Sequence, residues 1–248
     1  MLERNKIYLG DCLEVMRDIN DKSLDMIFTD LPFGTTQNKW DCIIPLDKLW
    51  EQYNRIIKNN GAIVLFAQSP FNIALGYSNI KNLKYEWVWQ KDRATGHLNS
   101  KKMPMKTHEN ILIFYKKTPT YNPQFWESKP MNTVYKNGGG GNNYNDCDKI
   151  ENTIFNSTKR YPIDILKFNT VNGQSKDKTK HPTQKPLDLC EYFIKTYSNE
   201  GETILDNCTG SASIPIACIN TNRNYIGIEK DEQYYNMACK RIEKYKIS

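Results

Sequence analysis

The stretch with the clearest chemical potential is Asp30-Leu31-Pro32-Phe33-Gly34, which directly follows the apolar run 25–29. The Asp30 carboxylate can accept a hydrogen bond from an amino group, and the Leu31 carbonyl, held by the proline-stiffened turn, can accept a second. Phe33 offers a flat face on which a planar ring can stack. The combination suits the exocyclic amine of a base that has been flipped out of a duplex. A strand-ending turn with a surface Asp and a core Phe is the alternative.

A second candidate site is the run Asp206-Asn207-Cys208-Thr209-Gly210-Ser211, which follows the apolar stretch 203–205 and opens a helical pattern. Gly210 permits a tight turn and a close approach of the backbone to a ligand. Free N–H groups at a helix start attract an anionic group such as a carboxylate or a phosphate. The sequence has neither a G-x-G-x-x-G motif nor a P-loop lysine, so it lacks the fingerprints of dinucleotide and triphosphate sites.

Two further carboxylates follow strand-like segments. Glu229 ends the run Asn224–Glu229, and an acidic side chain about 20 positions beyond a ligand turn is placed to bind two ribose hydroxyls. The alternative is an acidic helix start, because Asp231 and Glu232 follow and the helix dipole favours negative charge there. Asp11 follows a short strand-like run and could meet the amino group of an adenine ring, but by itself it is more typical of a helix N-cap.

An alternating framework of strands and helices must position these groups. Apolar runs predict strands, and apolar spacing of three to four predicts helices. The strands are expected at 6–9, 25–29, 62–66, 85–89, 111–115, 203–205 and 225–228, and the helices at 12–19, 47–58, from Pro70, 186–197, 214–220 and 233–245. Continuous apolar strands separated by helices indicate an α/β fold with a doubly wound, mostly parallel sheet of about seven strands. Ligands bind at the carboxyl ends of such strands.

The middle of the chain has a different character. Between residues 117 and 180 periodicity is weak, and turn formers and the run Gly138–Asn143 predict an insertion with long loops. From Lys91 to Lys180 there are 16 Lys and Arg against 8 Asp and Glu, whereas the whole chain has a net charge of +6. The basic excess therefore lies in the middle, which favours a polyanionic partner there. A solvated lysine-rich surface is the alternative.

The composition narrows the class of protein. The chain has 248 residues, 39% hydrophobic and 25% charged, which is typical of one folded domain with a small appendage. No apolar run reaches the ~18–20 residues that a membrane helix needs, and no secretory apolar stretch begins the sequence. Seven scattered cysteines, no C-x-x-C pair and three histidines argue against a disulfide framework and a zinc site. We expect a cytosolic protein with reduced thiols and no metal.

Together, these motifs resemble the DNA amino-methyltransferases that use S-adenosylmethionine, in the group whose catalytic motif precedes its cofactor motif. The matching segments follow the family's order over essentially the whole chain: 10–12, 29–34, Trp89-Gln90-Lys91 through His108-Glu109, 181–186, 206–211 and 227–229. The likeness is greatest to the short adenine-N6 enzymes of bacteria and their phages. It implies site-specific methylation of adenine N6 in duplex DNA, with base flipping, in the cytoplasm of a bacterial or phage-infected cell.

The resemblance implies a role for each matching residue. In the catalytic tetrapeptide Asp30-Leu31-Pro32-Phe33, Asp30 and the Leu31 carbonyl would accept hydrogen bonds from the target amine, Pro32 would set the turn, and Phe33 would stack on the flipped base. Glu229 would hold the cofactor's ribose hydroxyls. The other implied cofactor residues are Asp11 at the adenine edge with the adjoining Cys12, Lys185 near the methionine carboxylate, and Asp206, Cys208, Gly210 and Ser211 in the cofactor loop.

The sequence departs from the family pattern in two places. Leu31 replaces the first proline of the usual Asp-Pro-Pro-Tyr, which is tolerable because only the backbone carbonyl is used. Cys208 replaces an aromatic residue and Ala212-Ser213 replace Gly-Thr, so weaker cofactor binding is expected. Asp rather than Ser at the first tetrapeptide position resembles the adenine-N6 type more than the cytosine-N4 type. Cytosine-N4 methylation, an RNA substrate and a catalytically silent DNA-binding regulator remain alternatives.

The resemblance also divides the chain into regions. Residues 1–116 would carry the catalytic motif, 117–180 would be the target-recognition insertion, and 181–248 would complete the same catalytic domain with the cofactor motif. The expected nucleic-acid contacts are Arg93, Lys101, Lys102 and Lys106, in a loop beside the target base, and Arg160 in the insertion. Phosphate contacts by such lysines would supply affinity rather than sequence choice. Double-stranded DNA is the expected partner, and a homodimer is compatible with the chain's small size.

Overall fold

The computed structural model describes residues 2–36, 38, 41–134, 154–175 and 177–247. The chain separates into two compact units, one made of Met1–Asn122 with Asp164–Ser248 and the other of Pro123–Ile163. None of the described helices has the length and apolarity needed to cross a membrane.

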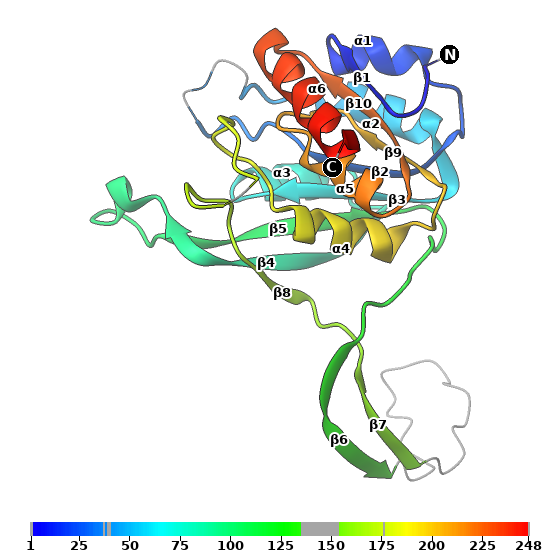
Figure 1. Cartoon of the computed structure of the whole chain (residues 1–248), viewed down its shortest axis with the longest axis vertical. Helices are drawn as coiled ribbons and strands as arrows, with labels where there is room; N and C mark the ends of the chain where they lie inside the picture. Colours follow the sequence, from blue (N-terminus) through cyan, green and yellow to red (C-terminus); the bar gives the residue numbers. More distant parts are fainter. Residues whose placement is uncertain (1, 37, 39–40, 135–153, 176, 248) are drawn as a thin grey trace. The chain divides into compact units, whose positions relative to one another are not determined.

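An eight-stranded sheet forms the centre of the first unit (Figure 1). Its order is β1 (Lys6–Leu9), β10 (Asn224–Glu229), β9 (Thr203–Asp206), β2 (Leu24–Asp30), β3 (Ile57–Ala67), β5 (Lys106–Phe114), β4 (Leu83–Thr95) and β8 (Ile165–Phe168). The strands from β1 to β3 in this order are parallel, β5 is antiparallel to both of its neighbours, and β8 is parallel to β4. The predicted α/β fold with a mostly parallel sheet is confirmed, and every predicted strand lies in that sheet.

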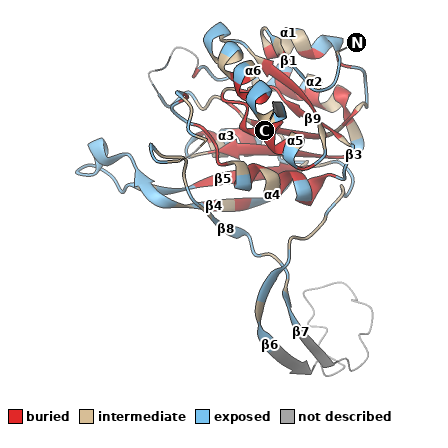
Figure 2. Cartoon of the chain, in the orientation of Figure 1, coloured by how far each residue is buried: buried red, intermediate tan, exposed pale blue. Residues whose placement is uncertain are grey.

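Helices cover both faces of the sheet, as continuous apolar strands require. On one face lie α1 (Cys12–Val15), η1 (Met16–Asp18), α2 (Leu46–Ile56) and α3 (Phe71–Ser78), and on the other α4 (Leu187–Tyr197), α5 (Ser213–Asn220) and α6 (Glu232–Ile247). Along β3, Val64 and Phe66 pack toward α4–α6, whereas Ile63 and Leu65 pack toward α1–α3. Figure 2 shows the buried strands between the two helix layers. The hydrophobic core therefore consists of two layers, one on each face of the sheet.

The middle segment contains more regular structure than its weak periodicity predicts. Where an insertion with long loops was expected, β6 (Trp126–Val134) and β7 (Ile154–Arg160) pair antiparallel in the second unit, and β8 extends the central sheet. β8 escapes prediction because it is a four-residue edge strand that alternates exposed and half-buried residues, and so has no continuous apolar run. The glycine run Gly138–Asn143 lies outside the described residues.

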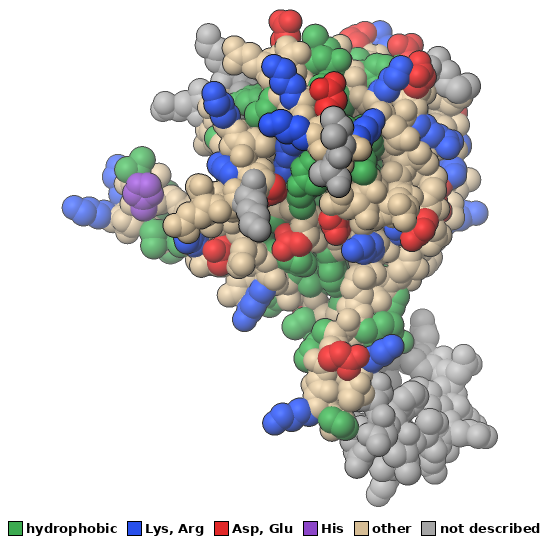
Figure 3. All heavy atoms as spheres, viewed as in Figure 1, with side chains coloured by type: hydrophobic (Ala, Val, Ile, Leu, Met, Phe, Trp, Pro, Cys, Tyr) green, Lys and Arg blue, Asp and Glu red, His purple; other side chains and the backbone are tan. Residues whose placement is uncertain are grey.

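Beyond the sheet, β4 and β5 continue into a hairpin arm, defined here as residues 93–106. Their pairing shifts between Gln90 and Thr95, and the chain turns through Gly96, at φ +87, into the short helix η2 (His97–Asn99). The arm carries four Lys and Arg residues and no Asp or Glu. In Figure 3 it projects from the body of the first unit, with basic and hydrophobic side chains on its surface. This arm holds most of the basic residues expected to contact nucleic acid.

Candidate active site

The carboxylates identified in the sequence meet at one edge of the sheet. Asp30, Asp206 and Glu229 are the last residues of β2, β9 and β10, and Asp11 follows β1 by two positions. Because these strands are parallel and adjacent, their carboxyl ends share that edge. β9 connects onward to β10 on one side, whereas β2 connects to β3 on the other. The topological switch point, where α/β sheets bind ligands, therefore lies between Asp206 and Asp30.

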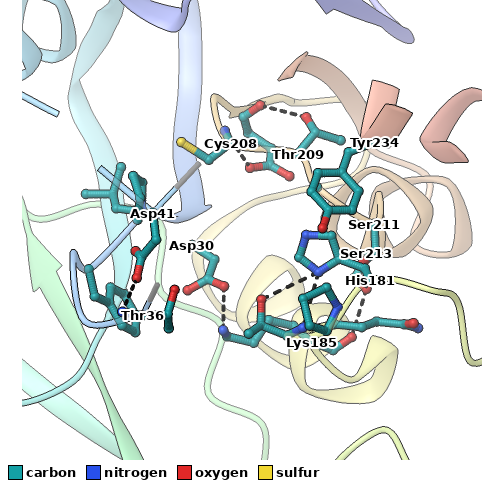
Figure 4. A pocket seen from close by; sticks show the side chains of 18 of the residues that line it. Asp30, Thr36, Asp41, His181, Lys185, Cys208, Thr209, Ser211, Ser213 and Tyr234 are labelled. Atoms are coloured by element: carbon teal, nitrogen blue, oxygen red, sulfur yellow. Dashed lines mark hydrogen bonds and ion pairs between the residues drawn. The ribbon is translucent and has the colours of Figure 1, made fainter. Parts of the chain in front are cut away.

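A cavity of about 910 Å³ opens at this edge (Figure 4). It is at the upper end of the usual size range of ligand pockets. Its walls contain every residue predicted for catalysis and cofactor binding: Asp11, Cys12, Asp30, Leu31, Pro32, Phe33, Lys185, Asp206, Cys208, Gly210, Ser211 and Glu229. Arg93, at the base of the hairpin arm, lines the same cavity. The structure thus brings the two candidate sites of the sequence into one pocket, while the role of each residue stays a prediction.

β2 and β9 are joined at the switch point by their own side chains. Thr29 Oγ1 donates to Asp206 Oδ1 at 2.9 Å, and the backbone N–H of Cys208 donates to the same oxygen at 3.4 Å. Burial raises the pKa of Asp206 to about 7, against the opposing effect of these hydrogen bonds. Asp206 therefore shapes the turn and offers an acceptor whose charge is sensitive to pH near neutrality.

The glycine turn after β9 is fastened to Glu229. Gly210 has a φ of +51, and its N–H donates to Glu229 Oε2 at 2.7 Å. A Cβ at this position would lie 2.9 Å from His181 Nε2, so the close packing requires glycine. Glu229 Oε1 accepts the N–H of Asp231 at 2.8 Å, and it is Asp231 that caps α6. Each Glu229 oxygen keeps a further lone pair with which it can accept a hydrogen bond from a hydroxyl.

Asp11 is a helix N-cap, as its position after a short strand suggested, and its contact with an adenine ring stays a prediction. Its Oδ1 accepts the N–H of Leu13 at 2.9 Å, which caps α1, and its Oδ2 pairs with Lys230 at 3.0 Å. It nonetheless lines the cavity, beside Cys12 and Cys208. A hydrogen bond with Cys12, together with burial, raises the pKa of the Cys208 thiol well above its usual value. Cys208 therefore presents a neutral, weakly polar surface to this part of the cavity.

A chain of paired charges borders the tetrapeptide Asp30-Leu31-Pro32-Phe33. Lys185 Nζ lies 2.5 Å from Asp30 Oδ2 and 3.4 Å from Glu109 Oε2, and Lys91 Nζ lies 2.5 Å from Glu109 Oε1. Among the residues that the structure describes, no group donates a hydrogen bond to the buried Asp30 Oδ1. Asp30 thus has one oxygen bound to a cation and one free to accept a hydrogen bond from a ligand. Lys185, expected near the methionine carboxylate, here donates a hydrogen bond to Asp30 and forms a longer ion pair with Glu109.

The segment that supplies Lys185 is held by residues that sequence reasoning missed. Ser213 Oγ donates to the Lys185 carbonyl at 2.8 Å, and Gln184 Nε2 donates to the Asp177 carbonyl at 3.0 Å. Arg241 on α6 pairs with the Asp177 carboxylate at 3.2 Å. Gln184 belongs to a motif noted in the sequence, but Arg241 sits in an ordinary charged helix with no distinguishing signal.

Asp41 is a second residue that the sequence did not reveal. Its carboxylate accepts the backbone N–H groups of Gly34, Thr35 and Thr36 at 2.8, 2.9 and 2.7 Å. Burial opposes ionisation, but the hydrogen bonds from Thr36 and its neighbours hold the pKa of Asp41 below its usual value. Asp41 thereby closes the loop after Phe33, and Figure 4 shows it beside Thr36 at the cavity wall. The Phe33 ring itself stacks on Phe71 of α3, with centroids 5.4 Å apart.

The expected nucleic-acid residues fall in both units. Arg93, Lys101, Lys102 and Lys106 lie on the hairpin arm. Lys106 is partly engaged, because its Nζ donates to Gln68 Oε1 at 3.0 Å. Arg160 ends β7 in the second unit, where its Nη2 donates to the Lys129 carbonyl at 2.8 Å.

Comparison with known proteins decides the family. The family model described as DNA methylase, for N6 and N4 methyltransferases, matches residues 24–240. This chain belongs to the N6/N4 DNA methylase family. It is 27% identical to the DNA adenine methyltransferase YhdJ of Escherichia coli (strain K12), over 97% of this chain and 83% of the relative. It is 23% identical to the type II methyltransferase M.HpaI of Haemophilus parainfluenzae, over 96% of this chain and 74% of the relative.

Solved structures agree with this assignment. The M1.HpyAVI–SAM complex superposes with a TM-score of 0.63 at 25% identity, covering 95% of this chain and 98% of the other. The cytosine-N4-specific PvuII DNA methyltransferase superposes with a TM-score of 0.69 at 16% identity, covering 100% and 92%, and shows the shared fold. The family resemblance inferred from the motifs is confirmed. The N6/N4 family includes adenine-N6 and cytosine-N4 enzymes. Membership of the family therefore does not say which base this protein methylates.

His181 generates a prediction about acid stability. Burial, followed by repulsion from Lys185, lowers the pKa of His181 to about 4, so the ring is neutral at pH 7. An unfolded histidine has a pKa near 6.5, so the unfolded state binds more protons between these values, and stability is lost as pH falls from about 6.5 toward 4. Between pH 7 and pH 5 this contribution falls by about 2 kcal/mol.

We expect His181→Gln to lose about 2 kcal/mol less unfolding free energy than the wild type between pH 7 and pH 5, as measured by urea titration at each pH. Asp206 has a raised pKa and contributes a slope of the opposite sign, but it is present in both proteins and cancels in the difference. Equal losses in the two proteins would contradict a buried neutral His181.

Proposed function

We propose that this protein transfers the methyl group of S-adenosylmethionine to the exocyclic N6 of adenine in duplex DNA. The observation that carries the proposal is the Asp30 carboxylate, which lines the cavity with Oδ2 on Lys185 and with Oδ1 lacking a partner among the described residues. Oδ1 and the adjoining Leu31 carbonyl can together accept both hydrogens of an amine. A base amine is a weak nucleophile because its lone pair is delocalised into the ring, and two such acceptors favour a more tetrahedral nitrogen. Catalysis then depends on positioning and electrostatics.

Two observations favour adenine over cytosine. Asp rather than Ser at the first tetrapeptide position resembles the adenine-N6 type. The relative YhdJ, 27% identical over 97% of this chain, is a DNA adenine methyltransferase. Cytosine-N4 is the second candidate, because the PvuII enzyme with the same fold is cytosine-N4-specific and cytosine presents a similar amine to the same pair of acceptors.

The cavity's residues fit S-adenosylmethionine, with which the similar M1.HpyAVI forms a complex. Glu229 keeps acceptor capacity for the ribose hydroxyls, Asp11 would accept from the adenine amino group, and the Gly210 turn would lie along the methionine part. When bound, this cofactor supplies a methyl group on a sulfonium, which is a strong electrophile. Asp30 and the Leu31 carbonyl orient the amine, and Phe33 provides the face on which the flipped base stacks.

The hairpin arm is the proposed contact with the DNA backbone. It begins at Arg93 on the cavity wall and carries Lys101 and Lys102 as exposed side chains. Since the arm contains four Lys and Arg residues and no Asp or Glu, it carries a net positive charge beside the site proposed for the flipped base. A duplex contacting the arm would therefore lie at the cavity mouth.

The first test is nucleoside mass spectrometry on DNA incubated with the protein and isotope-labelled S-adenosylmethionine. We expect labelled N6-methyladenine from the wild type, and none from Asp30→Ala, which removes the acceptor while sparing DNA binding. Labelled N4-methylcytosine would show that the target base is cytosine rather than adenine. Cofactor binding without any label in DNA would instead favour an RNA substrate or a catalytically silent regulator.

A second test separates cofactor binding from catalysis. Glu229→Ala removes the acceptor proposed for the ribose hydroxyls, so we expect the calorimetric affinity for S-adenosylmethionine to fall at least about tenfold, the equivalent of about 1.4 kcal/mol. Asp30→Ala is the matched control and should retain affinity within about threefold. Equal losses in both variants would contradict the division of the cavity into a cofactor part and a base part.

A third test concerns the arm. Lys101→Gln with Lys102→Gln should weaken DNA binding and reduce the slope of log affinity against log salt by about 1–2, since each phosphate contact contributes about 0.9. The rate at saturating DNA should not change. The matched control is Lys81→Gln with Lys240→Gln, which removes two exposed lysines outside the arm. An equal change of slope in the control would indicate a general charge effect rather than contact with the arm.

A further inference from the structure

Two buried charges beside the site have no part in the mechanism described so far. Lys91 on β4 and Glu109 on β5 belong to motifs noted in the sequence, and their side chains are only 7% and 10% exposed. Burying a charge costs free energy unless it is paired, and replacing a buried pair by apolar residues is often neutral or stabilising. Fold stability by itself therefore gives no clear reason for this pair.

The connection to the catalytic carboxylate runs through Lys185. In the sheet, Asp30 on β2 is opposite Phe66 on β3, and Phe66 is opposite Ile111 on β5, two residues from Glu109. Lys185 Nζ lies 4.9 Å from the centroid of the Phe66 ring, and it contacts Asp30 Oδ2 on one side and Glu109 Oε2 on the other. Lys185 thus crosses over β3 and joins the carboxylate of β2 to that of β5.

Neighbouring elements restrict the two lysines. The Lys185 backbone is held by Ser213, whose hydroxyl donates to its carbonyl at 2.8 Å, and its side chain is 8% exposed. Lys91 Nζ lies 5.0 Å from the ring centroid of Trp89, whose Nε1 donates to the Phe168 carbonyl of β8 at 2.9 Å. Both ends of the charge chain are therefore attached to fixed parts of the fold.

We propose that Lys185 is a positioning residue: it holds Asp30 Oδ2 so that Oδ1 is the oxygen offered to the target amine, and Glu109, held by Lys91, keeps Lys185 in place. This gives Lys91 and Glu109 a function and orients the carboxylate before the base arrives, which lowers the entropic cost of the reactive geometry. The proposal rests on the proposed function only in requiring an exocyclic amine, of adenine or cytosine, as the methyl acceptor.

The charges around Asp30 predict the direction in which its pKa should change in each variant. The charged groups that face it are Lys185, Glu109 on β5, Lys91 on β4 and Asp206 on β9. Burial raises the pKa of Asp30, Lys185 lowers it, and Glu109 raises it. Removing the Lys185 cation should therefore raise that pKa further, whereas removing the Glu109 charge should lower it. A loss of fold stability alone would lower kcat without moving its pH dependence in opposite directions in the two variants.

The experiment measures kcat against pH at saturating DNA and cofactor, counting labelled methyl groups on either base. For Lys185→Met we expect kcat at pH 7.5 to fall at least about tenfold. The acid limb of the profile, where kcat falls at low pH, should move up by about one pH unit or more. The KM for DNA and the Kd for S-adenosylmethionine should stay within about threefold. Lys185→Arg retains the cation and should keep the acid limb near its wild-type position.

Glu109→Gln is the opposing variant, and its acid limb should move to lower pH. Because it leaves Lys91 without its carboxylate, the double variant Lys91→Met with Glu109→Gln preserves the charge balance. Its downward shift should be smaller than that of Glu109→Gln, because Lys91 also lowers the pKa of Asp30. Thermal unfolding of each variant reports whether it is folded. If Lys185→Met does not fold, the direction in which Glu109→Gln moves the acid limb of kcat decides whether the proposal holds.

Two results would overturn the proposal. One is a loss of cofactor affinity of about tenfold or more in Lys185→Met with an unmoved acid limb, which would place Lys185 on the cofactor instead. The other is an upward or absent shift in Glu109→Gln. Labelling of cytosine alone would refute the choice of adenine and leave this test intact. A protein inactive on every DNA would refute the proposed function, and the pKa of Asp30, followed through the pH dependence of unfolding in the same variants, would still decide the positioning role.

Discussion

A carboxylate buried at the end of a parallel strand needs a nearby cation, and Lys185 is that cation for Asp30. Without it, desolvation would favour the protonated acid, which donates a hydrogen bond where the proposed target amine would need an acceptor. The Lys185 cation lowers the pKa of Asp30 against the larger effect of burial, and the contact at 2.5 Å occupies only one of the carboxylate oxygens. Much of the surrounding structure serves this contact, from the segment that carries Lys185 to the charge chain through Glu109 and Lys91.

The sheet topology explains why catalytic and cofactor groups lie next to each other although they are far apart in the sequence. β2 and β9 are neighbours because the chain returns to the centre of the sheet after the middle segment, and this creates the switch point. Asp30 then ends β2 on one side of the switch point, while Asp206 and Glu229 end β9 and β10 on the other. The Thr29–Asp206 hydrogen bond joins β2 to β9 directly at the switch point.

The walls of the cavity are short loops held by side chains that accept backbone N–H groups. Asp41 does this for the loop after Phe33, and Glu229 does it for the Gly210 turn. Loops of this kind can carry ligand-binding groups because a buried acceptor replaces the hydrogen bonds of a regular element. The rigid sheet edge and these capped loops give the cavity its shape, while the hairpin arm adds a basic surface beside it.

Much of this protein could be predicted from local sequence. Continuous apolar runs determined the buried strands, and residues such as Asp30, Asp206 and Glu229 stood out because a polar group directly follows such a run. The order of motifs pointed to the family. β8 could not be predicted, because an exposed edge strand has no apolar signal, and Asp41 and Arg241 could not, because their partners are set by loop geometry.

Tertiary structure alone decided which charges pair. The sequence by itself placed Lys185 in a cofactor segment and left Lys91 and Glu109 without a role. A charged side chain has no periodicity that reports its partner, and the pairing depends on strand order: Lys185 can reach both Asp30 and Glu109 only because β3 alone separates β2 from β5. The sequence therefore determined the chemistry available at the sheet edge, and the packing of distant segments determined which oxygen of Asp30 is left free.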